Sequence, residues 1–445
     1  MKRHYAILIF IVLAMTACQK EENSAAALDE RLRMTLIANS PDLSEFILPD
    51  SDEYSKIPQD LNNPLTKAKV DLGRLLFHET GLAVVPQDEI GRGTYSCASC
   101  HFAAAGFQAG IAQGIGEGGE GFGLRGEERV QQAHYDVQKV DVQPIRTPTY
   151  MNIAYQELML WNGQFGAVGA NEGTEDLWPE NTPIAKNHLG FEGAETQAIA
   201  ALDVHRQQCQ DSMMVAMGYD HLFDAAFPEI DISERYSNTT AGLAIAAYER
   251  TVLANQAPFQ KWLRGDRNAM TLQEKSGAIL FFGKAECATC HKGPALNEMA
   301  FHALGMKDLY ESEFSTIRTS AIDRENFGRA SFTRKDADKF RFKVPQLYNL
   351  ADSPFYGHGS SFTSIEEVVL YKNRGKKENQ SVPSGRLSEH FKPLFLDHAE
   401  VAAITAFLET GLYDPALSRY QPQQVLSNQC IPNNDLLSKE DLGCQ

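Results

Sequence analysis

Two short cysteine motifs carry the most specific chemistry in this sequence. One comprises Cys97, Cys100 and His101, and the other comprises Cys287, Cys290 and His291, so both follow the pattern C-x-x-C-H. Two thiols at this spacing lie on one turn, where each can add to a vinyl group of the same haem, and the adjacent histidine can bind the iron. The sequence therefore predicts two covalently bound c-type haems, with the two histidines as proximal ligands.

Paired cysteines also occur in zinc sites and in redox-active disulfides. A zinc site would share four ligands between motifs that lie far apart in the chain, and it would leave the repeated histidine unexplained. A thioredoxin-like pair would require a neighbouring βαβ pattern, which is not found near either motif. The haem interpretation is therefore preferred.

The amino terminus has the pattern of an export signal. A basic stretch at residues 2–4 precedes the apolar residues 6–15, and Ala17 comes directly before Cys18. The apolar stretch is too short to span a membrane, and a small residue before a cysteine is typical of bacterial lipoproteins. We predict a signal peptide over residues 1–17 and an exported, periplasmic, outer-membrane lipoprotein whose only membrane contact is a lipid on Cys18. A plain secretory signal is the alternative.

Three further cysteines remain. Cys430 and Cys444 enclose a segment rich in proline and asparagine, where a disulfide would staple a stretch with little core of its own. Cys209 is then left over and is expected to be a buried free thiol.

The composition fits a folded, acidic protein. The chain has 445 residues, of which 43% are hydrophobic and 22% charged, so a largely disordered chain is excluded. The formal net charge of −17 repels phosphate backbones and predicts no nucleic-acid partner. A cationic protein or a neutral small molecule is a better candidate for the partner of this acidic protein.

Helical patterns surround both motifs. Residues 72–77 (LGRLLF) and 277–282 (GAILFF) each end shortly before the haem cysteines, which indicates two related modules. Residues 240–255 and 399–408 show helical periodicity, and Pro258 interrupts the chain after the first of them. Runs of β-branched residues are few. The predicted fold class is mostly α, with two cytochrome-c-like haem domains and long loops.

Glycine is concentrated in residues 106–126. This stretch superficially resembles a phosphate-binding loop, but no strand precedes it and no Gly-Lys-Ser/Thr pattern ends it. We expect a flexible loop beside the first haem.

One more helix is predicted after Ser364. Ser364 and Glu367 form a capping box, and the apolar positions 365, 368 and 369 then share a helix face with Lys372. Tyr371 points elsewhere. A lysine on such a face either has a specific partner or extends its amine to a propionate or to water.

The ordered set of motifs resembles a known family. The matching stretches are residues 72–77, 97–101, 146–149 (RTPT), 160–163 (LWNG), 287–293 and 342–349 (FKVPQLYN). Over roughly residues 60–415 the chain resembles the bacterial di-haem cytochrome c peroxidases and their MauG-type relatives. The resemblance implies that His101 ligates a catalytic haem, that His291 ligates an electron-transfer haem, and that Trp161 lies between them. Core packing is the alternative role for Trp161.

With this resemblance we expect five segments. They are the signal peptide (1–17), a lipid-attached tether and leader (18–58), a peroxidatic haem domain (59–258), an electron-transfer haem domain (259–420) and a tail (421–445).

Several positions depart from the family pattern. Gln197 matches the family's distal glutamine, but the distal glutamate that follows is replaced by Gln207, which cannot titrate. His205 is therefore expected to carry protons there, or to act as a displaceable iron ligand. Arg146 stands where the family has a calcium-binding asparagine, so no calcium is predicted. Arg146 is expected to be a fixed charge or to bind a haem propionate.

The sixth ligand of the second haem is predicted from the same resemblance. The family's ligand position falls on Lys372, whose amine can bind iron once it is neutral. Met306 is the alternative.

The sequence thus predicts an exported di-haem peroxidase that reduces hydrogen peroxide to water. Its electrons would come from a small redox protein such as a cytochrome c or a cupredoxin, and His205, Gln197 and Trp161 would be its catalytic residues. A MauG-like enzyme that oxidises a protein or a small molecule is one alternative. A non-catalytic di-haem electron carrier is the other.

Overall fold

The computed structural model describes residues 24–444, and most of the regular secondary structure in this part of the chain is helical, as the sequence predicts. The predicted signal peptide and Cys18 lie outside the described residues. The α-helices are α2 (Ala25–Asn39), α3 (Lys67–His78), α4 (Gly193–Val204), α5 (Asp211–Met217), α6 (Asp220–Ala226), α7 (Ile232–Arg235), α8 (Asn238–Arg250), α9 (Pro258–Leu263), α10 (Leu272–Phe282), α11 (Ala330–Thr333), α12 (Ile365–Arg374), α13 (His398–Ala406) and α14 (Leu436–Leu442). Two short antiparallel pairs join β1 (Gly119–Glu120) to β2 (Val130–Gln131) and β3 (Glu298–His302) to β4 (Phe342–Val344). None of the helices between residues 24 and 444 combines the length and apolarity needed to cross a membrane.

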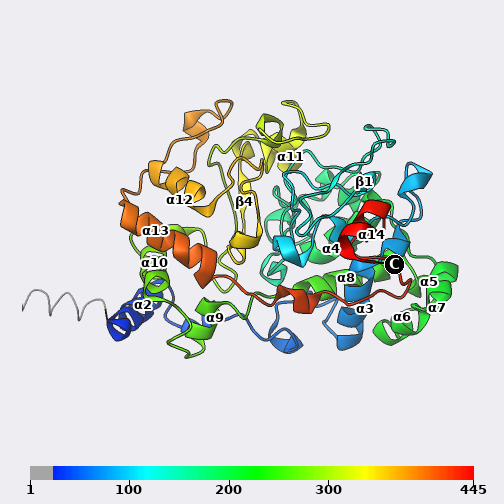
Figure 1. Ribbon diagram of the computed structural model, residues 1–445, viewed down its shortest axis with the longest axis horizontal. Coiled ribbons are helices and arrows are strands. Elements are labelled where there is room, and N and C mark those ends of the chain that lie inside the picture. The colour runs from blue at the N-terminus through cyan, green and yellow to red at the C-terminus, as the bar shows by residue number, and fades with distance from the viewer. Residues whose placement is uncertain (1–23, 445) are drawn as a thin grey trace, which may run out of the picture.

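Two groups of helices lie side by side (Figure 1). Helix α8 packs against α3 and α4 in one group, and α13 packs against α10 and α12 in the other. The helix that precedes each haem motif is capped in the same way. The hydroxyl of Thr66 accepts a hydrogen bond from the third residue of α3, and that of Thr271 accepts one from the third residue of α10, both at 3.2 Å.

A glycine in each group allows two helices to touch. A Cβ atom at Gly73 of α3 would lie 1.8 Å from the carbonyl oxygen of Ala244 in α8. A Cβ atom at Gly277 of α10 would lie 1.9 Å from the carbonyl oxygen of Ala403 in α13. No side chain fits at either place. The two segments that the sequence pairs therefore also pack alike.

The helix predicted over residues 240–255 is shorter than expected, because α8 ends at Arg250. The following residues leave the helix to bind Asn152, whose main-chain N–H donates to the carbonyl of Val252 (2.8 Å) and whose side-chain oxygen accepts from the N–H of Ala254 (3.0 Å). The interruption predicted at Pro258 is confirmed. Pro258 is the first residue of α9, where a helix needs no N–H donor.

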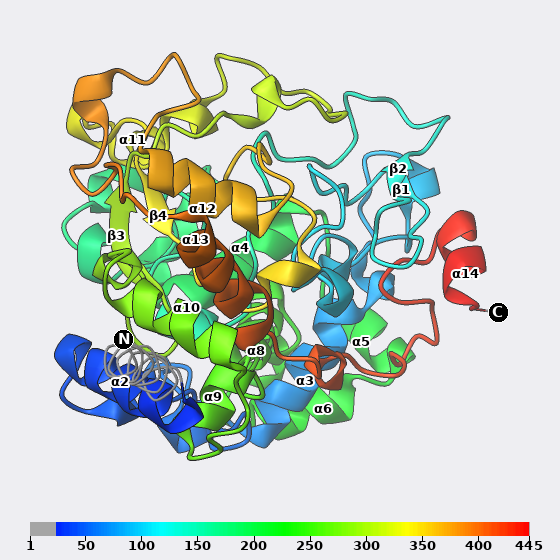
Figure 2. The same ribbon diagram turned by 60° about the vertical axis from the view of Figure 1, so that its left-hand side comes forward.

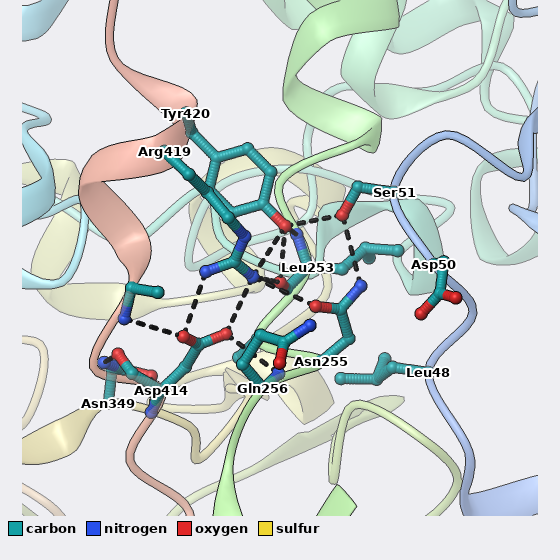
Figure 3. A network of polar contacts seen from close by, with 12 residues as sticks. Leu48, Asp50, Ser51, Leu253, Asn255, Gln256, Asn349, Asp414, Arg419 and Tyr420 are labelled. Carbon is teal, nitrogen blue, oxygen red and sulfur yellow. Dashed lines mark hydrogen bonds and ion pairs between the residues drawn. The ribbon is translucent and has the colours of Figure 1, made fainter. Parts of the chain in front are cut away.

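A polar network joins the chain that follows α8 to the chain that follows α13 (Figure 3). Arg419 forms an ion pair with Asp414 (2.8 Å) and donates to the carbonyl of Leu253 (2.9 Å) and the side chain of Asn255 (3.0 Å). The hydroxyl of Tyr420 also donates to Leu253, at 2.7 Å. These bonds fix the segment from which the carboxyl-terminal tail departs.

The tail returns to the first group of helices. Cys430 and Cys444 form the predicted disulfide, and α14 between them lies against β1 (Figure 2). Asp435, just before α14, forms a buried ion pair with Arg129 (3.4 Å). Cys209 is a buried free thiol, as predicted.

Candidate active site

Each cysteine motif folds into a single 3-10 turn that faces its own cavity. The first turn, at Cys97–Ser99, borders a cavity of about 210 Å³, and the second, at Cys287–Thr289, borders one of about 300 Å³. In both cases the two cysteines and the histidine of the motif all line the cavity. The thiols are not bonded to each other.

Main-chain carbonyls fix the ring orientation of both motif histidines. The Nδ1 atom of His101 lies 3.1 Å from the carbonyl oxygen of Phe107, and that of His291 lies 3.0 Å from the carbonyl oxygen of Leu296. A carbonyl only accepts, so Nδ1 carries the proton and Nε2 keeps its lone pair for a metal. Burial lowers the pKa of each histidine to about 4, so both rings are neutral at physiological pH.

The two cavities share a wall. Arg146, Trp161 and Phe342 are among the residues that line both cavities. The indole Nε1 of Trp161 donates to the main-chain carbonyl of Arg146 (2.8 Å), and its ring packs edge-on against His358, with centroids 6.3 Å apart. The Trp161 side chain therefore lies between the two cavities.

His205 and Gln197 both line the first cavity, together with Trp161. His205 follows α4, and its Nδ1 atom lies 2.6 Å from a carboxylate oxygen of the buried Asp141. Burial alone would lower the pKa of His205, but the Asp141 carboxylate outweighs this effect and raises it. Because Nδ1 donates to Asp141, Nε2 is the free ring nitrogen. The side chain of His205 is 39% exposed, and it lines the first cavity.

The glycine-rich stretch supports this arrangement. Arg206 forms ion pairs with Asp141 (3.3 Å) and with Glu117 of the glycine-rich stretch. A Cβ atom at Gly114 would lie 3.1 Å from the sulfur of Cys100, so the stretch lies beside the first motif, as predicted. Residues 112–119 are buried rather than exposed as a surface loop.

A second titratable group in this cavity was not predicted from the sequence. Glu249 of α8 lines it, and no hydrogen-bond partner of its Oε2 atom is found within residues 24–444. Burial and the nearby Glu195 raise the pKa of Glu249 to about 8, so the carboxyl is protonated at neutral pH. The sequence pattern that could have revealed Glu249 is a single acidic residue directly after the mostly apolar residues 241–248, which indicates a buried carboxyl group. Gln207 is buried in the same cavity, with its side-chain oxygen 3.5 Å from the sulfur of Cys97.

Lys372 lies in the second cavity. Helix α12 begins at the predicted capping box, and its apolar positions 365, 368 and 369 line this cavity with Lys372 and Met306. Burial lowers the pKa of Lys372 to about 8. Tyr371 points away from the cavity, as predicted, and its hydroxyl donates to a main-chain carbonyl at 2.6 Å.

The residues of both cavities fit a covalently attached haem. Each cavity offers two unbonded thiols and a neutral imidazole with a free Nε2 atom. At the shared wall, the Nε atom of the buried Arg146 has no hydrogen-bond partner among the described residues. A buried guanidinium with a free donor is suited to an anionic group, and a haem carries carboxylates.

Comparison with known proteins gives the same assignment. A family model described as di-haem cytochrome c peroxidase matches residues 67–268. The methylamine utilization protein MauG of Methylorubrum extorquens is 28% identical over 361 residues, which are 81% of this chain and 82% of that protein. The cytochrome c peroxidase of Escherichia coli is 30% identical over 373 residues, which are 83% of this chain and 64% of that protein.

A solved structure is also similar. It belongs to a MauG-like protein associated with microbial copper homeostasis, with a TM-score of 0.56 and 25% sequence identity over 83% of this chain and 95% of that one. The fold shared with this structure, the sequence matches and the two motif-lined cavities on either side of Trp161 all indicate the same kind of protein. The chain is therefore similar to the di-haem cytochrome c peroxidases and MauG proteins, and like these oxidoreductases it carries two covalently bound c-type haems.

Proposed function

We propose that this chain is an exported peroxidase that reduces hydrogen peroxide to two water molecules, with two protons from solvent and two electrons from a small redox protein. One observation carries the proposal. In the first cavity, the neutral His101 faces the same space as His205, whose ring is held by a buried carboxylate.

His205 is the residue that we assign to proton transfer. Asp141 keeps its Nδ1 atom protonated and sets the ring orientation, which leaves Nε2 to exchange a proton with peroxide. Gln197 and Gln207 can only form hydrogen bonds, so they orient the substrate. The haem of this cavity, when bound, supplies the iron at which peroxide binds and is reduced.

Electrons would enter at the second cavity and pass the shared wall. Trp161 lies there, and we assign it the relay between the two haems. The net charge of −17 favours a basic donor by electrostatic steering. A cytochrome c or a cupredoxin fits this description, and the relative in Escherichia coli is named a cytochrome c peroxidase.

A MauG-like oxidation of a protein or a small molecule uses the same two cavities, and one relative is named MauG. The deciding assay combines the haem-loaded protein with hydrogen peroxide and reduced cytochrome c. We expect two donor molecules oxidised per peroxide. Absence of turnover with the donor alone, but oxidation of an added protein substrate, would favour the MauG-like reaction. Two haems that stay six-coordinate in every redox state and do not react with peroxide would identify an electron carrier.

We also propose a periplasmic location with a lipid anchor on Cys18. The signal pattern and the Ala17–Cys18 junction support it. Labelled palmitate should be incorporated into the wild-type protein in a bacterial host and not into Cys18→Ala. Secretion of an unlabelled wild-type protein would show a plain signal peptide instead.

A further inference from the structure

Two copies of one short sequence pattern border the cavities. Residues 145–152 read IRTPTYMN and residues 342–349 read FKVPQLYN, so a basic residue, a proline and an asparagine recur at the same spacing. The asparagine of each copy has left-handed backbone geometry, with φ of 59° and 53°. The proline carbonyl of each copy binds the neighbouring motif histidine, at 3.2 Å for Pro345 and His291. The basic residues, Arg146 and Lys343, are therefore equivalent positions beside the two haem motifs.

Arg146 is buried and has only neutral partners. It is 1% exposed and lines both cavities. Its terminal nitrogens donate to the carbonyl of Ile111 (3.1 Å), the carbonyl of Ala109 (3.4 Å) and the hydroxyl of Ser353 (2.9 Å). Its Nε atom has no partner within the described range. Burial lowers the pKa of Arg146 to about 9.

Lys343 is in the same situation at the second cavity. It is 7% exposed, and its amine donates to the side-chain oxygen of Gln156 and to the carbonyl of Leu158 (2.6 Å). Both partners are neutral. Burial lowers the pKa of Lys343 to about 7.

The main chain of both basic residues is also hydrogen-bonded to Trp161. The indole N–H of Trp161 donates to the carbonyl of Arg146, and the main-chain N–H of Lys343 donates to the carbonyl of Trp161, each at 2.8 Å. Trp161, which lies between the cavities, is thus hydrogen-bonded to the main chain of both basic residues.

Two buried cations with only neutral partners are unfavourable unless an anion joins them. In contrast, the buried Arg250 of the same protein is paired with Glu195 at 2.6 Å. Haem carboxylates are anions that would enter these cavities with the cofactor. An ion pair with such a carboxylate offsets the cost of burial and stabilises the charged form of each basic residue.

We propose that Arg146 and Lys343 form a duplicated two-cation anchor for haem carboxylates at the shared wall, with Arg146 acting on both haems and Lys343 on the second. The anchor also sets the reduction potentials, because a nearby positive charge favours the reduced haem, which carries one positive charge fewer. The proposal rests on the two covalent haems and is independent of the peroxide reaction.

The test is a spectroelectrochemical titration of the haem-loaded protein without peroxide. Arg146→Gln should lower the midpoint potentials of both haems, and Lys343→Met should lower that of the second haem alone. Arg341→Gln is the matched control, because it removes an exposed positive charge two residues from Lys343 and should leave both potentials unchanged.

Charge-preserving variants separate charge from packing. Arg146→Lys and Lys343→Arg should keep the potentials close to those of the wild type, and they decide the question if a neutral variant fails to fold or to take up haem. The anchor is wrong if the neutral variants leave both potentials unchanged, or if the charge-preserving variants lower them. Either result can occur in a fully active peroxidase, so it is distinct from failure of the proposed function.

Discussion

Replacing His205 tests the proposed proton transfer most directly. His205→Ala removes the imidazole that faces the first cavity and leaves His101 untouched. Loss of a general acid–base typically costs a factor of about 10² to 10⁴ in rate, which is about 3–5 kcal/mol of transition-state free energy. Glu249 lines the same cavity and holds a proton at neutral pH, so it can replace part of the lost function. We therefore expect about 10² for His205→Ala and about 10⁴ when Glu249→Gln is added.

The assay is stopped-flow measurement of the peroxide reaction, with kcat/KM from steady-state donor oxidation and haem content from the denatured protein. His221→Ala is the matched control, because His221 is 70% exposed on its side chain and lines neither cavity. It should behave as the wild type. A double variant with wild-type kcat/KM and both haems bound would refute the assignment of proton transfer to this cavity wall.

The ion pair between His205 and Asp141 predicts how activity depends on pH. The Asp141 carboxylate raises the pKa of His205 against the effect of burial, so the imidazolium persists to higher pH than in a free histidine. Asp141→Asn should therefore move the alkaline limb of the kcat/KM profile to lower pH. The free energy of unfolding should also fall as the pH rises. The stabilisation from charged His205 is complete below its unfolded pKa of about 6.5 and is lost as the pH rises through the higher folded value.

Other variants test the remaining residues. Trp161→Phe keeps an aromatic filler in the shared wall, so stability should change little, while peroxide turnover with a reduced donor should fall sharply; unchanged turnover would leave Trp161 a packing residue. Lys372→Met should raise the potential of the second haem and change its ferric spectrum, since a Met/His pair raises haem potential; identical spectra and potential would make Met306 the next candidate. Replacing both Cys97 and Cys100 by alanine should leave one covalent haem on a denaturing gel stained for haem, whereas no stain in the wild type would contradict the haem assignment. Cys430→Ser should lower the free energy of unfolding by about 3 kcal/mol, because the disulfide closes a loop of 14 residues in sequence separation; an unchanged denaturation midpoint would show that tail packing alone suffices.

The sequence was most informative where a local pattern has one physical meaning. The capping box at Ser364 set the start of α12, and with it the helix face that places Lys372 in the second cavity. Pro258 indicated an interruption after the preceding helix, and it proves to be the first residue of α9, where its missing N–H costs no hydrogen bond. The Cys430–Cys444 disulfide was predicted because the two cysteines enclose a tail with little core of its own.

Long-range contacts were the part that sequence could not provide. Asp141 lies 64 residues before His205 in the chain, and only the fold brings its carboxylate to the imidazole. Its position between Val140 and Val142 was a sign of burial but gave no partner. The early end of α8 has a similar cause, because Asn152 competes for the main chain that would have continued the helix. Helical periodicity cannot show such a competitor.

The proposed division of labour between the haems follows from how the two cavities differ. On the side of the motif histidines they are alike: a glycine-packed helix pair, a 3-10 turn and a carbonyl bound to Nδ1 recur in both. The remaining walls differ. In the first cavity, the ring of His205 is hydrogen-bonded to Asp141 and partly exposed. This arrangement suits proton exchange at an iron with an open coordination site. In the second, the amine of Lys372 is enclosed by the apolar face of α12, and burial favours its neutral form, which can bind iron. A strong ligand in that position would exclude peroxide from the second haem, so the identity of one residue on α12 is sufficient to confine the peroxide reaction to the first cavity.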